Sequence, residues 1–391
     1  MTILEVNKFY RRAGGAEVHL LALEKYLKAA RHRVVPFSMA DGRNIGTEWA
    51  RFFAPPVDFR GGRGWRNTLA MARMFWSRPA AQSMQVLLND LKRKRRWPEV
   101  AHAHNIYHQL TPSVLAVLKK NNIPVVMTVH DMHFFGTDYG ETKIEDALCN
   151  FELKLHKRLG LFEKLVDYMI APSRFAYKKL VRWGFPPERV IYLRHAVEAL
   201  PKPKSDVKHE SFLNLVFVGR LAHEKGVHHL LSALAQGPKK VTATVVGEGP
   251  LRPALERQAE RLGLGERVKF VGEQFGADLS RYILAGQALA VPSSVPEVFG
   301  LMMVEAMSLG RPVLAFDHGA APEIVEHGKT GWLVEPTTEG LIKGLEQVIK
   351  NYRKLTGMNK AAHAAAKAYG YDEYLPKILA VYEKAKARHL L

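Results

Sequence analysis

The stretch LNLVFVGRLAHEKGVHHLLSAL, residues 213–234, decides the fold. It begins with six mostly apolar residues, passes through a loop bounded by Gly219 and Gly226, and ends with leucines at helical spacing. An apolar run, a glycine-bounded loop and a helix together form the repeating unit of a parallel sheet covered by helices. Because the same rhythm recurs on both sides of this stretch, we expect an α/β protein.

Short apolar runs alternate with longer helix-like segments through both halves of the chain. The strands expected in the first half are residues 3–6, 33–37, 99–103, 124–129, 168–171 and 190–193. Those expected in the second half are residues 213–218, 241–246, 268–271, 289–291, 312–316 and 331–334. This alternation predicts two doubly wound parallel sheets with helices on both faces.

A segment at residues 199–211 interrupts the alternation, with two prolines, several charged residues and little apolar content, as is typical of an interdomain linker. The expected division is a Rossmann-like domain at 1–195, a linker at 196–210, a second Rossmann-like domain at 211–373, and a helix near 374–391 that packs back on the first domain. Ligands of such sheets bind beyond the carboxyl ends of the strands. We therefore expect a site where two such edges face each other across a cleft.

The charge is strongly positive, with 57 Lys and Arg against 38 Asp and Glu and a formal net charge of +19. Residues 1–200 hold 32 basic and 18 acidic residues, whereas the remainder holds 25 and 20. An unevenly basic chain indicates an anionic partner such as nucleic acid, a lipid surface or a phosphorylated substrate. A solvated cationic surface that serves solubility is the alternative.

Cysteine content and hydropathy exclude several classes of protein. Cys149 is the single cysteine, which excludes a scaffold held by internal disulfides. The first residues lack the apolar core of a signal peptide, and no apolar stretch of about 18 residues is present to span a bilayer. We therefore expect a cytoplasmic protein.

Two loops of the second half have the residues of an anion site. The loop at 219–226 offers the planar donors of Arg220 and the point charge of Lys225, a pairing suited to a diphosphate. It is not a P-loop, because no Ser or Thr follows Lys225. The next loop, Gly-Glu-Gly-Pro at 247–250, is followed by an amphipathic segment in which we expect Pro250 to be the first helical residue.

The stretch PEVFGLMMVEAM at 296–307 holds two carboxylates in an unusual setting. Glu297 falls in the loop after strand 289–291, and the amides of Phe299, Gly300 and Leu301 begin a helix whose positive end can receive an anion. Glu305 lies among apolar residues, where a carboxylate is costly unless it is paired or binds ligand hydroxyls. A structural, capped glutamate is the alternative for both.

In the first half, Gly14 and Gly15 begin a helix with backbone amides that no side chain covers, which suits a phosphate. His130 follows strand 124–129, and His104 follows the neighbouring strand. The histidines that allow a metal hypothesis are His102, His104, His108, His130 and His133. Their spacings match no ligand set that we can name, and the chain has no Asp-x-Asp, so we expect no metal.

Taken together, these motifs resemble family 4 of the retaining glycosyltransferases, which have the GT-B fold. The motifs that carry the resemblance are Gly219-Arg220-x4-Lys225-Gly226, Gly247-Glu248-Gly249-Pro250, Glu297-x7-Glu305 with Phe299-Gly300 inside it, Gly14-Gly15-Ala16-Glu17, His104-Asn105, His130-Asp131 and Ala171-Pro172-Ser173-Arg174-Phe175. They occur in the family's order and cover nearly the whole chain.

The resemblance implies a hexosyltransferase that moves a sugar from a nucleotide-sugar donor, a UDP- or GDP-sugar, to a glycan or lipid-linked acceptor, without a metal or other cofactor. Catalytic roles fall on His130, which binds a sugar hydroxyl, and on Glu297, which holds the transferred sugar. The residues implied to bind the donor are Gly14, Gly15, Arg220, Lys225, Glu248, Val271, Val298, Phe299, Gly300, Leu301 and Glu305, among which Glu305 holds the ribose hydroxyls. The second domain then binds the donor, and the first binds the acceptor.

Residues 60–96 mix basic and aromatic side chains, which suits an anionic membrane surface. The residues concerned are Arg60, Arg63, Arg66, Arg73, Arg78 and Lys92 to Arg96, with Trp65, Phe75, Trp76 and, just beyond, Trp97. Aromatics in the core beside a solvated cationic face are the alternative. The prediction is a peripheral protein of the inner membrane face that builds a cell-surface glycan or glycolipid.

Two other functions stay open at this stage. The basic composition favours a nucleic-acid-binding protein, although the sequence contains no recognition motif for one. A nicotinamide-dependent oxidoreductase is the other. Arg252 replaces the third glycine of the dinucleotide fingerprint, while Glu273 is placed to bind a ribose.

Overall fold

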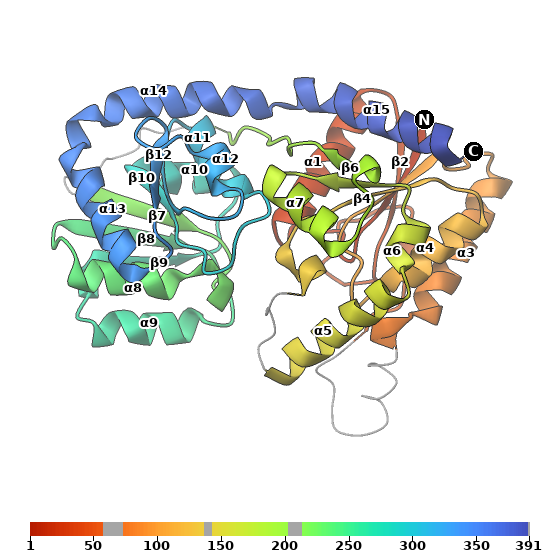
Figure 1. The fold of residues 1–391 in the computed structure, drawn as a ribbon, viewed down its shortest axis with the longest axis horizontal. Helices are drawn as coiled ribbons and strands as arrows, with labels where there is room; N and C mark the ends of the chain where they lie inside the picture. Colours follow the sequence, from red (N-terminus) through yellow and green to blue (C-terminus); the bar gives the residue numbers. More distant parts are fainter. Residues whose placement is uncertain (58–72, 137–142, 202–212, 390–391) are drawn as a thin grey trace. The chain divides into compact units, whose positions relative to one another are not determined.

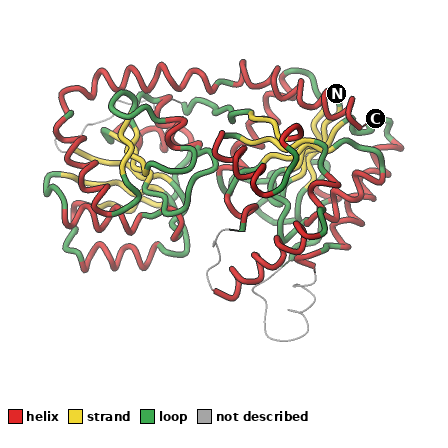
Figure 2. Tube along the Cα trace, viewed as in Figure 1, coloured by secondary structure: helices red, strands yellow, loops and turns green. Residues whose placement is uncertain are grey.

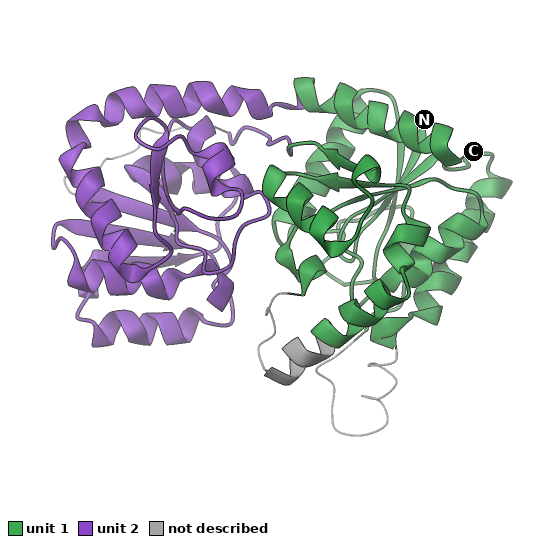
Figure 3. Cartoon of the chain, in the orientation of Figure 1, with its two compact units in different colours: residues 1–194, 372–391 green, residues 195–371 purple. Residues whose placement is uncertain are grey.

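The computed structural model describes residues 1–57, 73–136, 143–201 and 213–389, without the side chains of residues 143–149. The chain forms two compact units, one of Met1–Arg194 with Asp372–Leu391 and one of His195–Tyr371 (Figure 3). Residues 196–201 of the expected linker belong to the second unit, and residues 202–210 lie outside the described residues.

Unit 1 is built on a parallel six-stranded sheet in the order β2-β1-β3-β4-β5-β6. Its strands are β1 (Thr2–Val6), β2 (Arg33–Phe37), β3 (Val100–Ala103), β4 (Val125–Thr128), β5 (Tyr168–Ala171) and β6 (Val190–Tyr192). The neighbouring strands β1, β3 and β4 are buried along their whole length. Four polar side chains, Thr2, Glu5, His102 and Thr128, are therefore buried within these strands.

Unit 2 repeats this architecture, with strand order β12-β11-β10-β7-β8-β9 and every pair parallel. Its strands are β7 (Leu213–Val218), β8 (Val241–Val246), β9 (Val268–Gly272), β10 (Ala288–Val291), β11 (Val313–Phe316) and β12 (Gly331–Val334). Each strand expected from the sequence is thus present, with ends that differ by no more than one residue.

Helices cover the sheet faces in each unit (Figure 1; helices red and strands yellow in Figure 2). In unit 1 they are α1 (Gly15–Ala29), α3 (Arg78–Arg93), α4 (Thr111–Lys120), α5 (Lys143–Arg158), α6 (Leu161–Leu165) and α7 (Arg174–Trp183). In unit 2 they are α8 (Val227–Gln236), α9 (Arg252–Arg261), α10 (Gly276–Ala285), α11 (Leu301–Ser308), α12 (Ala321–Ile324), α13 (Thr338–Lys350) and α14 (Leu355–Ala366). Among the described residues, no helix is both long enough and apolar enough to cross a bilayer.

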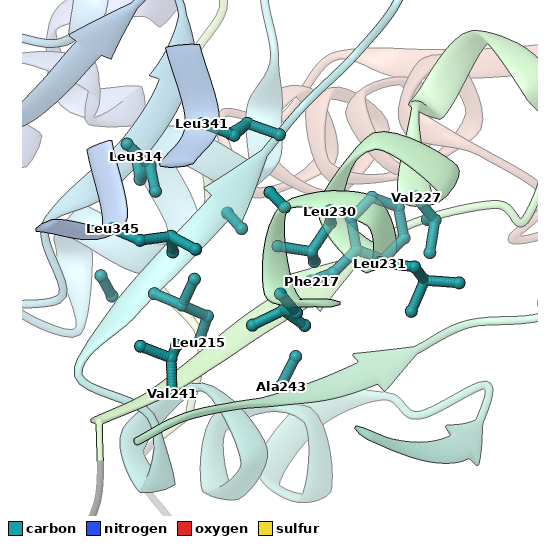
Figure 4. Close-up of a cluster of buried hydrophobic side chains, with 14 of the residues drawn as sticks. Leu215, Phe217, Val227, Leu230, Leu231, Val241, Ala243, Leu314, Leu341 and Leu345 are labelled. Carbon is teal, nitrogen blue, oxygen red and sulfur yellow. The ribbon is translucent and has the colours of Figure 1, made fainter. Parts of the chain in front are cut away.

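The core of unit 2 shows why the apolar run of β7 predicts a sheet buried on both faces. Leu215 and Phe217 point to one side, where Leu230, Leu231 and Leu345 pack against them (Figure 4). Val216, between them, points to the other side and joins the cluster of α11 and its neighbours. Burial on both faces requires apolar residues at consecutive positions, which is the pattern that the sequence shows.

The last helix, α15 (Tyr371–His389), follows α14 and belongs to unit 1 almost throughout, since that unit includes Asp372–Leu391. Two of its tyrosines are buried in unit 1, where the hydroxyl of Tyr382 lies 2.8 Å from Nδ1 of His102. The hydroxyl of Tyr374 lies 3.3 Å from Nε2 of His19. The polar interior of unit 1 is therefore completed by α15.

Candidate active site

The loops that follow β7, β8 and β10 pack backbone to backbone at the carboxyl edge of the unit 2 sheet. Gly247 has a φ of +143°, and a Cβ there would lie 1.9 Å from the carbonyl oxygen of Gly219. Gly226 has a φ of +68°, and a Cβ would lie 1.7 Å from the carbonyl oxygen of Pro292. Only glycine fits at either position. These contacts bring the proposed anion-binding residues to one edge.

Lys225 and Glu297 form the centre of this edge. Nζ of Lys225 donates to Oε1 of Glu297 at 2.7 Å, and the hydroxyl of Ser293 donates to the same oxygen at 2.7 Å. Burial acts to raise the pKa of Glu297, but the charge of Lys225 outweighs it, so this pKa lies below its ordinary value. Burial acts to lower the pKa of Lys225, but Glu297 outweighs it and raises that pKa. Both groups are therefore charged at neutral pH.

Arg220 lies on the same loop as Lys225 and has a carboxylate partner of its own. Its Nη2 donates to Oε1 of Glu224 at 2.6 Å, while 55% of the Arg220 side chain remains exposed. Glu224 is buried. An exposed guanidinium with one side held by a buried carboxylate keeps further donors for a ligand, because the group has five N–H bonds.

Two residues that follow β11 form hydrogen bonds to the loop that carries Glu297. The imidazole of His318 lies 2.9 Å from the carbonyl oxygen of Ser293, and the amide of Ala320 donates to the carbonyl oxygen of Glu297 at 2.9 Å. Burial lowers the pKa of His318, so the ring is neutral at pH 7 and donates from Nε2. Ser293, Glu224 and His318 are residues of this site that sequence reasoning missed.

Helix α11 begins at Leu301, directly after Gly300, which has a φ of +88°. Val298 and Phe299 are buried, and the ring of Phe299 packs against that of Tyr369 at 5.8 Å. Their side chains thus belong to the core, and it is their backbone that borders the site. Glu305 lies within α11 and is 7% exposed. Burial of this carboxylate agrees with the setting that the sequence predicts.

Two donor-binding residues implied by the resemblance lie at the ends of β8 and β9. Glu248 is half exposed and forms an ion pair with Arg252. Val271 is partly buried near the end of β9.

The expectation that Pro250 begins the next helix is wrong, because α9 begins at Arg252. The amide of Leu251 donates to the carbonyl oxygen of Leu221 at 3.0 Å, which holds this segment as a turn. Pro253 is the proline of the first helical turn.

In unit 1, α1 begins at Gly15 with exposed glycines at its N-terminus. Gly14 is the N-cap residue and supplies no side-chain hydrogen bond. The first-turn residue Glu17 is buried and accepts a hydrogen bond of 3.0 Å from Nδ2 of Asn7. The amides at this helix start are therefore reachable without an intervening side chain.

His130 ends a chain of three hydrogen-bonded side chains in unit 1. Its Nε2 lies 2.7 Å from Nδ1 of His104, and Nε2 of His104 lies 2.7 Å from Oε2 of Glu5. Glu5 and His104 are fully buried, whereas His130 is partly exposed at the carboxyl edge of the sheet. The predicted proximity of His104 and His130 is thus present, and Glu5 is the member that sequence reasoning missed.

The segment after His130 is held by Asp131. This side chain accepts from the amide of His133 at 3.1 Å and from Nδ2 of Asn105 at 3.1 Å, and it also accepts from the hydroxyl of Tyr107. The Asn105 and Asp131 of the two motifs therefore meet directly. Burial, with the charges of His108 and Lys8, lowers the pKa of His133 far enough to keep its ring neutral at pH 7.

Glu5, His102 and His104 are the one group of potential metal ligands that the described residues contain. All four ring nitrogens of the two histidines already have protein partners. Those of His102 lie 2.8 Å from the hydroxyl of Tyr382 and 2.7 Å from Oγ1 of Thr128. Those of His104 meet Glu5 and His130. The ring nitrogens are therefore satisfied within the protein, whereas the buried Oε1 of Glu5 has no hydrogen-bond partner among the described residues.

The basic segment of unit 1 is only partly described, since Arg60, Arg63, Trp65 and Arg66 lie outside the described residues. Trp76, before α3, is 41% exposed. Near the end of α3, Asp90 lies 2.8 Å from Arg93 and 2.9 Å from Lys94. Part of the cationic run is therefore neutralised by a buried carboxylate.

Comparison with known proteins places these features in one family. The family profile described as Glycosyltransferase Family 4 matches residues 13–199, and that described as Glycosyl transferases group 1 matches residues 201–365. The chain belongs to the family 4 glycosyltransferases. The two parallel sheets have the GT-B fold, as the sequence predicts. The family and its relatives support an enzyme of the hexosyltransferase type.

Curated relatives of this glycosyltransferase include one subunit of human phosphatidylinositol N-acetylglucosaminyltransferase, 25% identical over 349 residues. That match covers 87% of this chain and 66% of the human protein, just under two thirds of its length. Alpha-monoglucosyldiacylglycerol synthase of Acholeplasma laidlawii is 24% identical over 302 residues, which cover 73% of this chain and 75% of the relative.

Among solved structures, Anabaena Alr3699/HepE in complex with UDP and glucose superposes on the glycosyltransferase with a TM-score of 0.76 at 23% identity. The superposition covers 98% of this chain and 100% of that one, and it supports the fold. These similarities do not favour the two alternatives, a nucleic-acid-binding protein and a nicotinamide-dependent oxidoreductase.

Proposed function

We propose that the glycosyltransferase moves a sugar from a nucleoside diphosphate donor to a hydroxyl of a lipid-linked or polysaccharide acceptor, with retention of anomeric configuration. The observation that carries this proposal is the edge of unit 2 at which Lys225 pairs with Glu297, while Arg220 lies exposed on the same loop as Lys225. Two cations beside a carboxylate match the chemistry of a donor that presents a diphosphate next to the hydroxyls of a sugar.

Unit 2 takes the donor in this proposal. Arg220 and Lys225 bind the diphosphate, and Glu305 binds the ribose hydroxyls. Glu297 and the amides at Phe299 to Leu301 hold the sugar that is transferred. The related fold that was solved with UDP and glucose supports a UDP-sugar as the first donor to test.

Unit 1 takes the acceptor in this proposal. The exposed amides at Gly14 and Gly15 add a second contact for a phosphate, because a helix N-terminus favours anions. His130 forms a hydrogen bond to a sugar hydroxyl near the reacting carbon. The names of the human and Acholeplasma relatives contain the lipid names phosphatidylinositol and diacylglycerol, which supports a lipid-linked acceptor.

The transfer proceeds on one face of the sugar. The bond from the anomeric carbon to the diphosphate oxygen breaks, and the bond to the acceptor oxygen forms on the same side. The acceptor proton passes to the departing diphosphate. Arg220 and Lys225 stabilise the charge on that leaving group, which is the role of a divalent ion in transferases with Asp-x-Asp, so transfer needs no metal.

A donor screen followed by a transfer assay tests the proposal. Thermal unfolding is measured with UDP-, GDP- and ADP-sugars, where a ligand at about 100 times its Kd adds roughly 2.7 kcal/mol of stability. The stabilising donor is then incubated with glycan and lipid acceptors, and the anomeric configuration of the product is read by NMR. Stabilisation by no nucleotide sugar would overturn the donor assignment, and an inverted product would overturn retention.

The same assay is repeated in excess EDTA, with and without added Mg²⁺ or Mn²⁺. Because the proposed phosphate ligands are protein cations, the expected rate in EDTA equals the untreated rate. Complete loss of transfer that either metal restores would contradict the metal-independent step, while leaving the donor assignment intact.

A further inference from the structure

Glu5, His104 and His130 are joined by two hydrogen bonds, and hydrogen-bond chemistry determines which atom donates in each. We propose that Glu5 and His104 are positioning residues that fix His130 in the tautomer with its proton on Nε2 and its lone pair on Nδ1. The tautomer rests on the geometry of the three residues and on the charge states of Glu5 and His104. Its effect on turnover rests on the role proposed above for His130.

The first hydrogen bond, between Glu5 and His104, determines which ring nitrogen of His104 carries the proton. Burial acts to raise the pKa of Glu5, but His102 and His104 outweigh it and lower that pKa to about 2. Glu5 is therefore an ionised carboxylate at pH 7, which can only accept hydrogen bonds. Its Oε2 lies 2.7 Å from Nε2 of His104, so Nε2 of His104 must be the nitrogen that carries a hydrogen.

The second hydrogen bond, between His104 and His130, determines the tautomer of His130. Burial, together with the neighbouring His102, lowers the pKa of His104 to about 4, so its ring is neutral at pH 7 and carries one proton only. Because that proton is on Nε2, Nδ1 of His104 is an acceptor. Nδ1 lies 2.7 Å from Nε2 of His130, which must therefore donate. A neutral His130 then keeps its lone pair on Nδ1.

The three residues lie within or just after adjacent central strands. Glu5 lies within β1, His104 directly follows β3, and His130 follows β4 by two residues. These strands are neighbours in the order β1-β3-β4, with Glu5 opposite His102 and Ala103 opposite Met127. Side chains set by buried sheet register hold an imidazole more firmly than a loop does.

The fixed tautomer has a chemical consequence. Nε2 of a neutral His130 already donates to His104, so the ring meets a ligand hydroxyl as an acceptor through Nδ1. A hydroxyl that donates to Nδ1 turns its oxygen lone pairs away from the ring. His130 therefore selects the orientation of that hydroxyl, and a ring in the other tautomer would present a donor instead.

The buried Tyr382 offers a matched control. Its hydroxyl bonds to His102, which lies in the same polar cluster and 3.7 Å from Oε1 of Glu5. Tyr382→Phe removes one buried hydroxyl next to the chain without removing any of its three members. Any general damage from disturbing the cluster appears in this variant, whereas loss of the tautomer does not.

The test is NMR of protein labelled with ¹⁵N at the imidazole nitrogens, which distinguishes a protonated ring nitrogen from a bare one. The signals of His130 are assigned by their loss in His130→Gln. We expect a proton on Nε2 of His130 in the wild type and in Tyr382→Phe. Glu5→Gln should show a mixture of tautomers, because an amide offers both a donor and an acceptor to His104.

Activity provides the second measurement. Glu5→Gln should lower kcat on the order of 10- to 100-fold, the size of effect known for groups that orient a metal-bound histidine. The Kd for free nucleotide should stay unchanged, since the proposal assigns the nucleotide to unit 2. Tyr382→Phe should keep the kcat of the wild type.

Several results would overturn the proposal. One is a wild-type His130 with its proton on Nδ1, which needs no variant to fold. Another is one equivalent of zinc bound through Glu5 and His104 in the purified protein, since a metal would replace the proton on Nε2 of His104. A third is a Glu5→Gln protein that keeps both tautomer and kcat. Full activity in His130→Gln would instead refute the proposed role of His130 and leave the tautomer result standing.

Discussion

Lys225 and Glu297 are 72 residues apart in the sequence, and their side chains meet with 2.7 Å between Nζ and Oε1. The lysine follows β7 and the glutamate follows β10, two strands that are neighbours in the sheet. A diphosphate that binds to Lys225 therefore shares the ammonium group with a carboxylate. The two residues that we assign to different parts of the donor are coupled through this pair.

Removal of either cation should weaken nucleotide binding. Lys225→Ala and Arg220→Ala should each cost about 1.5–3 kcal/mol of affinity for a nucleoside diphosphate, or roughly 10- to 150-fold in Kd. Isothermal titration with UDP and GDP measures the loss. Lys239→Ala, an exposed lysine of the same unit, is the matched control and should bind as the wild type does. Equal Kd values in all four proteins would contradict the assignment of the diphosphate to this edge.

Substitution of Glu305 and substitution of Glu297 should have different effects on nucleotide binding and turnover. Glu305→Gln should raise the Kd for free nucleotide, because it weakens the contact with the ribose. Glu297→Gln should leave that Kd unchanged or lower it, since Lys225 loses its competing carboxylate, while kcat with the intact donor falls. Titration and steady-state kinetics on both variants separate the roles. If both variants lost nucleotide affinity equally and kept full turnover at saturation, the division would be wrong.

The buried His104 should make the stability of unit 1 depend on pH. Its pKa is near 6.5 in an unfolded chain and about 4 in the folded protein, chiefly because burial disfavours the charged ring. The stabilisation is complete above pH 6.5 and is lost as the pH falls toward 4, since the unfolded chain then binds a proton that the folded protein does not. Urea unfolding between pH 6.5 and 5 should therefore show a shallower pH dependence in His104→Gln, by up to about 1.4 kcal/mol per pH unit. Parallel curves would refute the burial of a neutral ring.

The basic segment should bind anionic membranes. Each Lys or Arg near such a surface contributes about 1 kcal/mol. The structure changes the choice of variant, because Arg93 and Lys94 contact the buried Asp90, and their replacement by Glu would disturb the fold. A triple change at Lys92, Arg95 and Arg96 to Glu should release the protein from anionic liposomes in a co-sedimentation assay, more completely as salt rises.

A change of equal charge in unit 2, Lys239, Lys240 and Arg261 to Glu, serves as the control for net charge and should keep the binding. The wild type should not sediment with neutral liposomes. Negligible sedimentation of the wild type with both lipid types at low salt would withdraw the membrane proposal. The basic segment would then be a solvated face.

The fold was largely predictable because burial on both faces makes central strands such as β7 and β8 nearly continuous apolar runs. β7 and β8 match the expected ranges 213–218 and 241–246 to the residue. The start of α9 was not predictable, because it depends on a hydrogen bond between Leu251 and Leu221, which belong to two different loops. Contacts of that kind have no local signal in the sequence.

The sequence allowed the residue types of the candidate site to be predicted. It did not show which of these residues pair with one another. Glu5 carries the signal that singled out Glu305, a carboxylate within an apolar run, yet its partner His104 is 99 residues away. Pairing over such a distance follows from strand order, which alternation alone does not specify. Ser293 carried no signal, since a serine in a loop is common in any sequence.

The position of α15 after the whole of unit 2 in the sequence has a consequence for biosynthesis. A ribosome that releases about 5–20 residues per second needs on the order of 10–40 s between Arg194 and Tyr382. During that interval the sheet of unit 1 has emerged without the tyrosines that cover His19 and His102. Ribosome-stalled chains that end at residue 371 should therefore exchange the amide hydrogens of β3 faster than chains that include α15. The first unit to be translated is then the last to mature, and its buried histidines report when α15 has been made.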